Sequence, residues 1–93
     1  MLKLGDPILA FIDLFVDSPY VDDVVNSLKE YKNVTEIYEV TGEFDIVILV
    51  NASDIEELRD LLKNKIMKIK GIKSTVSSIV LKSHRTLVSP KTQ

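Results

Sequence analysis

The order of hydrophobic and polar residues along the chain predicts four β-strands. The first apolar run, ILAFIDLFV, is almost continuous, as expected for a strand buried on both faces, and Asp13 is its single polar interruption. The second run alternates and is rich in β-branched and aromatic residues, which favour strands. The third is again strongly apolar, whereas the fourth carries serine, threonine and lysine. The predicted strands are residues 8–16, 34–41, 44–51 and 72–81.

Two segments between these strands have apolar residues at helical spacing. Ser18 followed by Pro19 supplies a helix N-cap and a proline at the first helical position, and the periodic pattern continues to about Lys32. The second segment begins with the capping-box pattern of residues 53–56, and Gly71 can end it. The predicted order is therefore strand, helix, strand, strand, helix, strand.

This order favours an α+β domain of the ferredoxin-like βαββαβ type. Right-handed crossovers place the first and third strands side by side in the centre of a four-stranded antiparallel sheet, with both helices on one face. The second and fourth strands then form the edges, which their more polar residues suit. Gly42 and Glu43 are predicted to join the second and third strands in a tight hairpin.

The central strands are apolar on both faces, yet two helices can cover only one face of such a sheet. An uncovered apolar face on a small protein normally marks an interface, and packing two sheets face to face would bury it with two-fold symmetry. Two interpretations of Asp13 stay open, a functional acid or a strand residue close to solvent. We expect a dimer whose interface contains Phe44, Ile46, Val47, Ile48 and Leu49.

Composition and charge limit the classes of function. The chain has 93 residues, no cysteine and a net charge of −2, so one domain without disulfides is expected. Residues 1–62 carry four basic and fourteen acidic side chains, and residues 63–93 carry eight basic and none acidic. This asymmetry favours internal pairing or head-to-tail assembly over direct nucleic-acid binding. Without a signal peptide or a membrane-spanning run, a cytoplasmic protein with no membrane partner is expected.

Catalytic chemistry has few candidate side chains. His84 is the only histidine, and neither a cysteine nucleophile nor a cluster with metal-ligand spacing is present, so no catalysis, cofactor or metal is expected. Five lysines between Lys63 and Lys73 could neutralise phosphates. Cations near the end of a helix also complement its dipole, and no aromatic residues are interleaved, so the structural interpretation is favoured.

The segment TGEFD at residues 41–45 is the most specific local feature. As structure, Gly42 can supply the positive φ of a turn, and Asp45 can hydrogen-bond the turn backbone. As function, Asp45 is a carboxylate beside backbone donors and suits an ammonium group. The residues alone favour the structural interpretation, because Gly and Asp are common in turns.

Two motifs resemble those of a known family. The stretch VTGEFDIV at residues 40–47 is similar to the V-T-G-x-[YF]-D signature of the Lrp/AsnC effector-binding domain, also called the RAM domain. Gly71-Ile72, followed by Thr75 and Ser77, resembles the second signature of that family, G-[VI]-x-x-T-x-[TS]. The resemblance covers residues 8–82, so we expect one domain over residues 1–82 and a mobile tail over residues 83–93.

The resemblance implies sheet-to-sheet dimers, rings of octameric or similar size, and amino-acid effectors bound between dimers. On this basis Asp45 would pair with the effector's ammonium group, while the backbone near Gly42 and the hydroxyls of Thr75 and Ser77 would hold its carboxylate or other polar groups. Phe44 replaces the commoner Tyr, and Ser77 replaces Thr, which could change effector preference. The residues that the resemblance implies for the effector site are Thr41, Gly42, Glu43, Asp45, Thr75 and Ser77.

Only about seven residues precede the first strand, which leaves no room for the helix-turn-helix domain of typical members. The resemblance thus implies a stand-alone form that regulates transcription indirectly, through effector-dependent assembly or association with full-length Lrp/AsnC regulators. Two alternatives stay open. One is a passive oligomerisation module without effector, and the other is a small enzyme of the dimeric α+β barrel type, which would need a polar cavity between sheet and helices.

Overall fold

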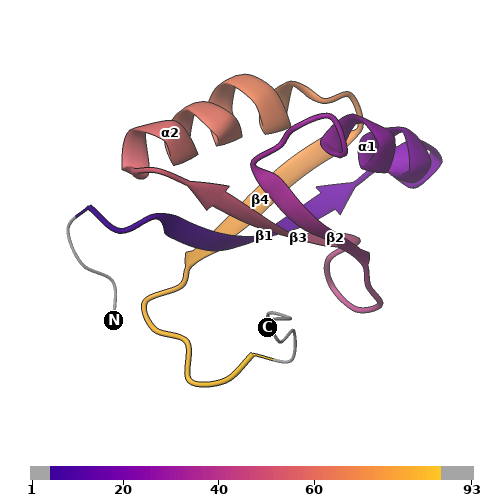
Figure 1. The fold of residues 1–93 in the computed structure, drawn as a ribbon. Coiled ribbons are helices and arrows are strands. Elements are labelled where there is room, and N and C mark those ends of the chain that lie inside the picture. Colours follow the sequence, from indigo (N-terminus) through magenta and orange to yellow (C-terminus); the bar gives the residue numbers. More distant parts are fainter. Residues whose placement is uncertain (1–4, 87–93) are drawn as a thin grey trace.

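The protein folds as an α+β domain in which one layer of helices covers one face of a four-stranded sheet (Figure 1). The computed structural model describes residues 5–86. Two short 3₁₀ turns, η1 and η3, and one π-helical turn, η2, accompany the helices. The elements are β1 (Ile8–Val16), η1 (Ser18–Tyr20), α1 (Val21–Leu28), β2 (Val34–Glu39), β3 (Ile46–Ala52), α2 (Ile55–Asp60), η2 (Leu61–Lys65), η3 (Ile66–Lys68) and β4 (Ile72–Ile79). The predicted βαββαβ order is confirmed.

The sheet has the order β2-β3-β1-β4, and all three strand pairings are antiparallel. The prediction that the first and third strands lie in the centre is therefore confirmed. Ile12 of β1 pairs with Ile48 of β3 on one side and with Ser77 of β4 on the other. Because neighbouring residues in register point to the same face, this pairing fixes which side chains share each face of the sheet.

One face of the sheet forms the core with the helices. Alternate residues of β1 and β3 are fully buried there, including Ile12, Leu14 and Ile48, against Leu28 of α1 and Ile66 of η3. Burial of each such side chain contributes roughly 1.5–3 kcal/mol relative to leaving it exposed. We call this the covered face.

The other set of alternate residues lies on the face without helices, which we call the open face. Leu9, Phe11 and Val76 are 39%, 44% and 48% exposed there. Asp13 is half-buried between two valines, because its register partners are Val47 on β3 and Val76 on β4. The open face is therefore apolar, with one carboxylate near its middle.

The expected interface set divides between the two faces. Ile46 and Ile48 are fully buried beneath the helices, so their assignment to the dimer interface is wrong. Side chains alternate along a strand, and only one of two neighbours can point away from the core. Val47 and Leu49 lie half-buried on the open face, and Phe44 packs against Phe15 with ring centroids 4.6 Å apart. The dimer itself stays a prediction.

The helices differ from the sequence prediction at their ends. Helix α1 stops at Leu28 instead of about Lys32. Ser18 caps neither η1 nor α1, since their N-cap residues are Asp17 and Tyr20, and neither of these makes a side-chain capping bond. Asp54 caps α2, since its Oδ1 accepts the Glu57 N–H at 2.8 Å. Glu57 Oε1 accepts the Ser53 N–H at 2.6 Å, and this bond lowers the pKa of Glu57. The capping pair thus lies one residue later than predicted.

A π-helical turn follows α2. The backbone N–H of Ile66 donates to the carbonyl of Leu61, five residues earlier. Leu61 and Ile66 are both buried, whereas Lys65, which a regular α-helix would place nearest to Leu61, stays exposed. The wider turn therefore matches the spacing of the apolar residues, and it places the second of them in the core.

Candidate functional site: the β2–β3 loop and the start of β4

The loop between β2 and β3 spans residues 40–45 and is longer than the tight hairpin predicted at Gly42-Glu43. The strands end at Glu39 and begin again at Ile46, and the Val40 N–H donates to the Asp45 carbonyl at 3.1 Å. Gly42 has φ +118°, and a Cβ added to it would meet open space. The glycine is thus required by backbone conformation rather than by a close neighbour.

Asp45 is bound to the neighbouring strand on both its backbone and its side chain. Its N–H donates to the Leu14 carbonyl at 3.0 Å, and its Oδ2 accepts the Val16 N–H at 2.8 Å. Asp45 thus has a structural role, but its side chain binds the neighbouring strand β1 and not the turn backbone that the sequence suggested. A carboxylate accepts at both oxygens, so the contact to Val16 also orients Oδ1 for a further donor.

Thr75 and Ser77 lie on the edge strand β4, in register with Leu14 and Ile12. They therefore point to the helix side of the sheet, with Thr75 half-buried and Ser77 exposed. Strand β1 lies between them and β3, which carries the loop. The structure brings Thr41, Gly42, Glu43 and Asp45 together in one loop but separates this group from Thr75 and Ser77 within a single copy.

Gly71, the first residue of the second motif, lies against Tyr20. Its φ is +103°, and an added Cβ would come within 2.4 Å of the Tyr20 Cβ. The Asp17 N–H donates to the Gly71 carbonyl at 2.8 Å, and Lys73 Nζ lies 3.5 Å from Asp17 Oδ1. This glycine therefore joins η1 to the start of β4. The sequence predicts a helix end and a family motif at Gly71 but not its contact with Tyr20, because the two residues are far apart in sequence.

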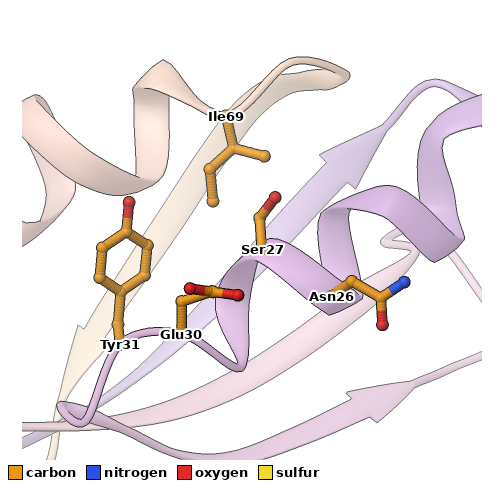
Figure 2. Close-up of a pocket in the computed structure, with 5 residues that line it drawn as sticks. All are labelled: Asn26, Ser27, Glu30, Tyr31 and Ile69. Carbon is orange, nitrogen blue, oxygen red and sulfur yellow. The ribbon is translucent and has the colours of Figure 1, made fainter.

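A surface cavity of about 500 Å³ lies in the helix layer, and no motif predicted it (Figure 2). Figure 2 shows Ser27, Glu30 and Tyr31 from the end of α1 and the turn after it, with Ile69 on the other side. It contains none of the predicted site residues. It also lies between elements of the helix layer, whereas the enzyme alternative needs a polar cavity between helices and sheet.

The remaining candidates fit structural roles. Lys65 lies 4.0 Å from Asp60 and over the Tyr31 ring at 6.0 Å, and Lys70 lies over the Tyr20 ring at 5.3 Å. His84 is exposed in the segment after β4. Within residues 5–86, no group of three or more His, Cys, Asp or Glu could hold a metal ion, and no helix is long and apolar enough to cross a membrane. Residues 87–93 of the predicted mobile tail lie outside the described residues.

The fold is that of a small α+β domain with helices on one face of its sheet and the other face open. Comparison with known families makes the assignment specific, because the sequence model of the Lrp/AsnC ligand binding domain matches residues 9–88. The chain belongs to this family.

Several curated relatives are transcriptional regulators. The HTH-type transcriptional regulator FL11 of Pyrococcus horikoshii is 37% identical over 82 residues, which cover 88% of this chain and 54% of FL11. The chain thus spans about half the length of the curated relatives it matches. A homocitrate synthase of Sulfolobus acidocaldarius is 36% identical over 76 residues, but these are only 16% of that enzyme.

Solved structures agree with the fold. Escherichia coli AsnC superposes with a TM-score of 0.84 at 32% identity, covering 91% of this chain and 58% of AsnC. A feast or famine regulatory protein of Mycobacterium tuberculosis, in complex with L-methionine, superposes with a TM-score of 0.75 at 27% identity, covering 92% and 60%. At least one relative of this fold therefore binds an amino acid.

Proposed function

We propose that the chain is an amino-acid-binding regulatory domain that forms sheet-to-sheet dimers and larger rings. It modulates transcription indirectly, through effector-dependent assembly or association with full-length Lrp/AsnC regulators. The strongest support is that the residues expected at the effector site lie in two groups, on opposite sides of strand β1. Asp45 and its loop lie on one side of β1, and Thr75 and Ser77 lie on the other. An effector held by the loop of one copy and by β4 of a second copy would make binding depend on assembly.

The open face supports the dimer. Its apolar side chains are 39–48% exposed at Leu9, Phe11 and Val76, and exposed apolar surface of this kind on a small domain normally marks an interface. A face-to-face dimer is closed by two-fold symmetry and leaves the β2–β3 loop and β4 at its periphery. These are the positions from which dimers can contact one another in a ring.

The first experiment is light scattering of the purified protein with and without each of the twenty amino acids, together with thermal shift. An assembly larger than a dimer that one or a few amino acids stabilise or resize supports the effector function. A ring that responds to none of them favours a passive oligomerisation module. The bond from Val16 to Asp45 is the observation in favour of that alternative, because it gives the carboxylate a role without any ligand.

Asp45→Asn separates these two roles. An amide oxygen can still accept the Val16 N–H, but the charge that would bind an ammonium group is gone. We expect the variant to keep its fold and dimer and to bind the effector at least about tenfold more weakly, which corresponds to about 1.4 kcal/mol. Asp60→Asn, on an exposed carboxylate in the helix layer, is the matched control. Unchanged affinity in Asp45→Asn would remove Asp45 from the site.

A further inference from the structure

The residues after β4 pass beneath the open face. The Val80 N–H donates to the Leu9 carbonyl at 2.8 Å, and the chain then continues on the side of the sheet opposite the helices (Figure 1). Residues 82–86 form a cavity of about 430 Å³ with Leu9, Phe11 and Leu49. Leu9 and Phe11 stay 39% and 44% exposed, so this segment forms one wall of a groove and does not cover the face.

The charges of this segment and of the open face are opposite. The segment carries Lys82 and Arg85, with His84 between them. The register places two carboxylates on the open face, Asp13 on β1 and Glu36 on β2, where Glu36 accepts from the Tyr38 hydroxyl at 2.6 Å. No ion pair joins Lys82 or Arg85 to these carboxylates within residues 5–86. The complementary groups are thus not paired with each other in the single chain.

We propose that residues 82–86 form an arm that clasps a second copy of this chain. In the sheet-to-sheet dimer, the arm of one copy lies against the open face of the other, its cations lie near Asp13 and Glu36 of that second copy, and an apolar side chain from that copy fills the groove. The proposal deepens the proposed function and rests on its dimer.

Desolvation gives the reason for this pairing. When a second copy covers the open face, Asp13 loses water, and an unpaired buried carboxylate weakens the dimer. A cation supplied by the arm of the partner offsets that cost. Two-fold symmetry makes the contact twice, so each copy both gives and receives an arm. The groove is complete only in the pair, which explains why the arm stands away from its own sheet.

The test is the dimer dissociation constant of the full chain, measured by sedimentation equilibrium. Lys82→Ala/Arg85→Ala is expected to raise it at least tenfold, and added salt should reduce the difference, because screening weakens exposed charge pairs. Lys63→Ala/Lys68→Ala removes the same charge from the helix layer and is expected to leave the constant unchanged. A double-mutant cycle between Arg85→Ala and Asp13→Ala then measures their coupling, which should exceed about threefold.

The outcomes separate this inference from the function on which it rests. A wild-type dimer whose dissociation constant is unaffected by the arm variants overturns the arm and leaves the dimer in place. A dimer that becomes tighter also overturns it, since the segment would then compete with the partner for the face. A wild-type chain that stays monomeric overturns both the arm and the sheet-to-sheet dimer.

Discussion

The two faces of the sheet are built from the same strands and from similar residues, yet only one of them is buried beneath the helices. On the covered face, Ile12, Ile46 and Ile48 are fully buried under the helices. On the open face, Leu9, Phe11 and Val76 stay 39–48% exposed near the half-buried Asp13. Hydrophobicity alone therefore does not tell the buried face of a sheet from the exposed one. Two features distinguish the faces: Asp13 interrupts the apolar residues of the open face, and the helices cover only the other face.

Placing a charge on each face is the strongest test of this difference. Ile48→Asp should leave the protein largely unfolded, because an unpaired carboxylate in the core costs about 3–5 kcal/mol and the lost burial of the isoleucine about 1.5–3 kcal/mol more, against the roughly 5–15 kcal/mol typical of a native protein. Phe11→Asp, on the open face, should give a folded monomer. Circular dichroism and sedimentation measure the two properties separately. A folded Ile48→Asp variant would contradict the assignment of the covered face.

The two glycines of the family motifs also differ in their surroundings, because Gly71 lies against Tyr20 and Gly42 has open space around it. Gly71→Ala should lower the free energy of unfolding by about 2–3 kcal/mol, because the added Cβ meets Tyr20 and the φ of +103° is unfavourable for alanine. Gly42→Ala carries only the backbone cost, about 1 kcal/mol, since open space surrounds it. Urea denaturation measures both. Equal losses would mean that the Tyr20 contact contributes nothing.

The smallest expected effect concerns the N-terminal cap of helix α2. The bond from the Ser53 N–H lowers the pKa of Glu57 below its ordinary value of 4.5, so the stabilisation is present above that pH in the folded protein. It is lost as the pH falls through the lowered folded pKa. The difference in urea midpoint between wild type and Glu57→Gln should therefore shrink from neutral pH to about pH 3. Glu56→Gln, one residue earlier, is the control and should show no such trend.

Much of the fold could be predicted because strand and helix periods are local properties of the sequence. The central position of the apolar strands followed from their composition and from the handedness of crossovers. Which of two neighbours points outward, Ile48 or Leu49, could not be read from hydrophobicity, because both are apolar. The end of α1 at Leu28 could not be predicted either, since Tyr31 continues the helical spacing of apolar residues beyond the end of the helix.

The two motifs of the candidate site could be predicted from the sequence, but the contacts of their residues in the folded chain could not. The loop around Asp45 follows from its turn-forming residues, whereas the Val16 N–H that occupies one of its oxygens belongs to a strand 29 residues away. Gly71 and Tyr20 likewise meet only in the folded chain. Such long-range contacts decide which atoms remain available for a ligand, and no local pattern in the sequence reports them.

The π-helical turn after α2 has a consequence for how the length of this chain can change. Deleting one residue from most strands would exchange their buried and exposed side chains. Deleting Asn64 would instead bring Leu61 and the following isoleucine to a spacing of four, which an ordinary α-helix places on the same side. A single-residue deletion within η2 would thus be absorbed by a change in helix type, with both side chains still in the core.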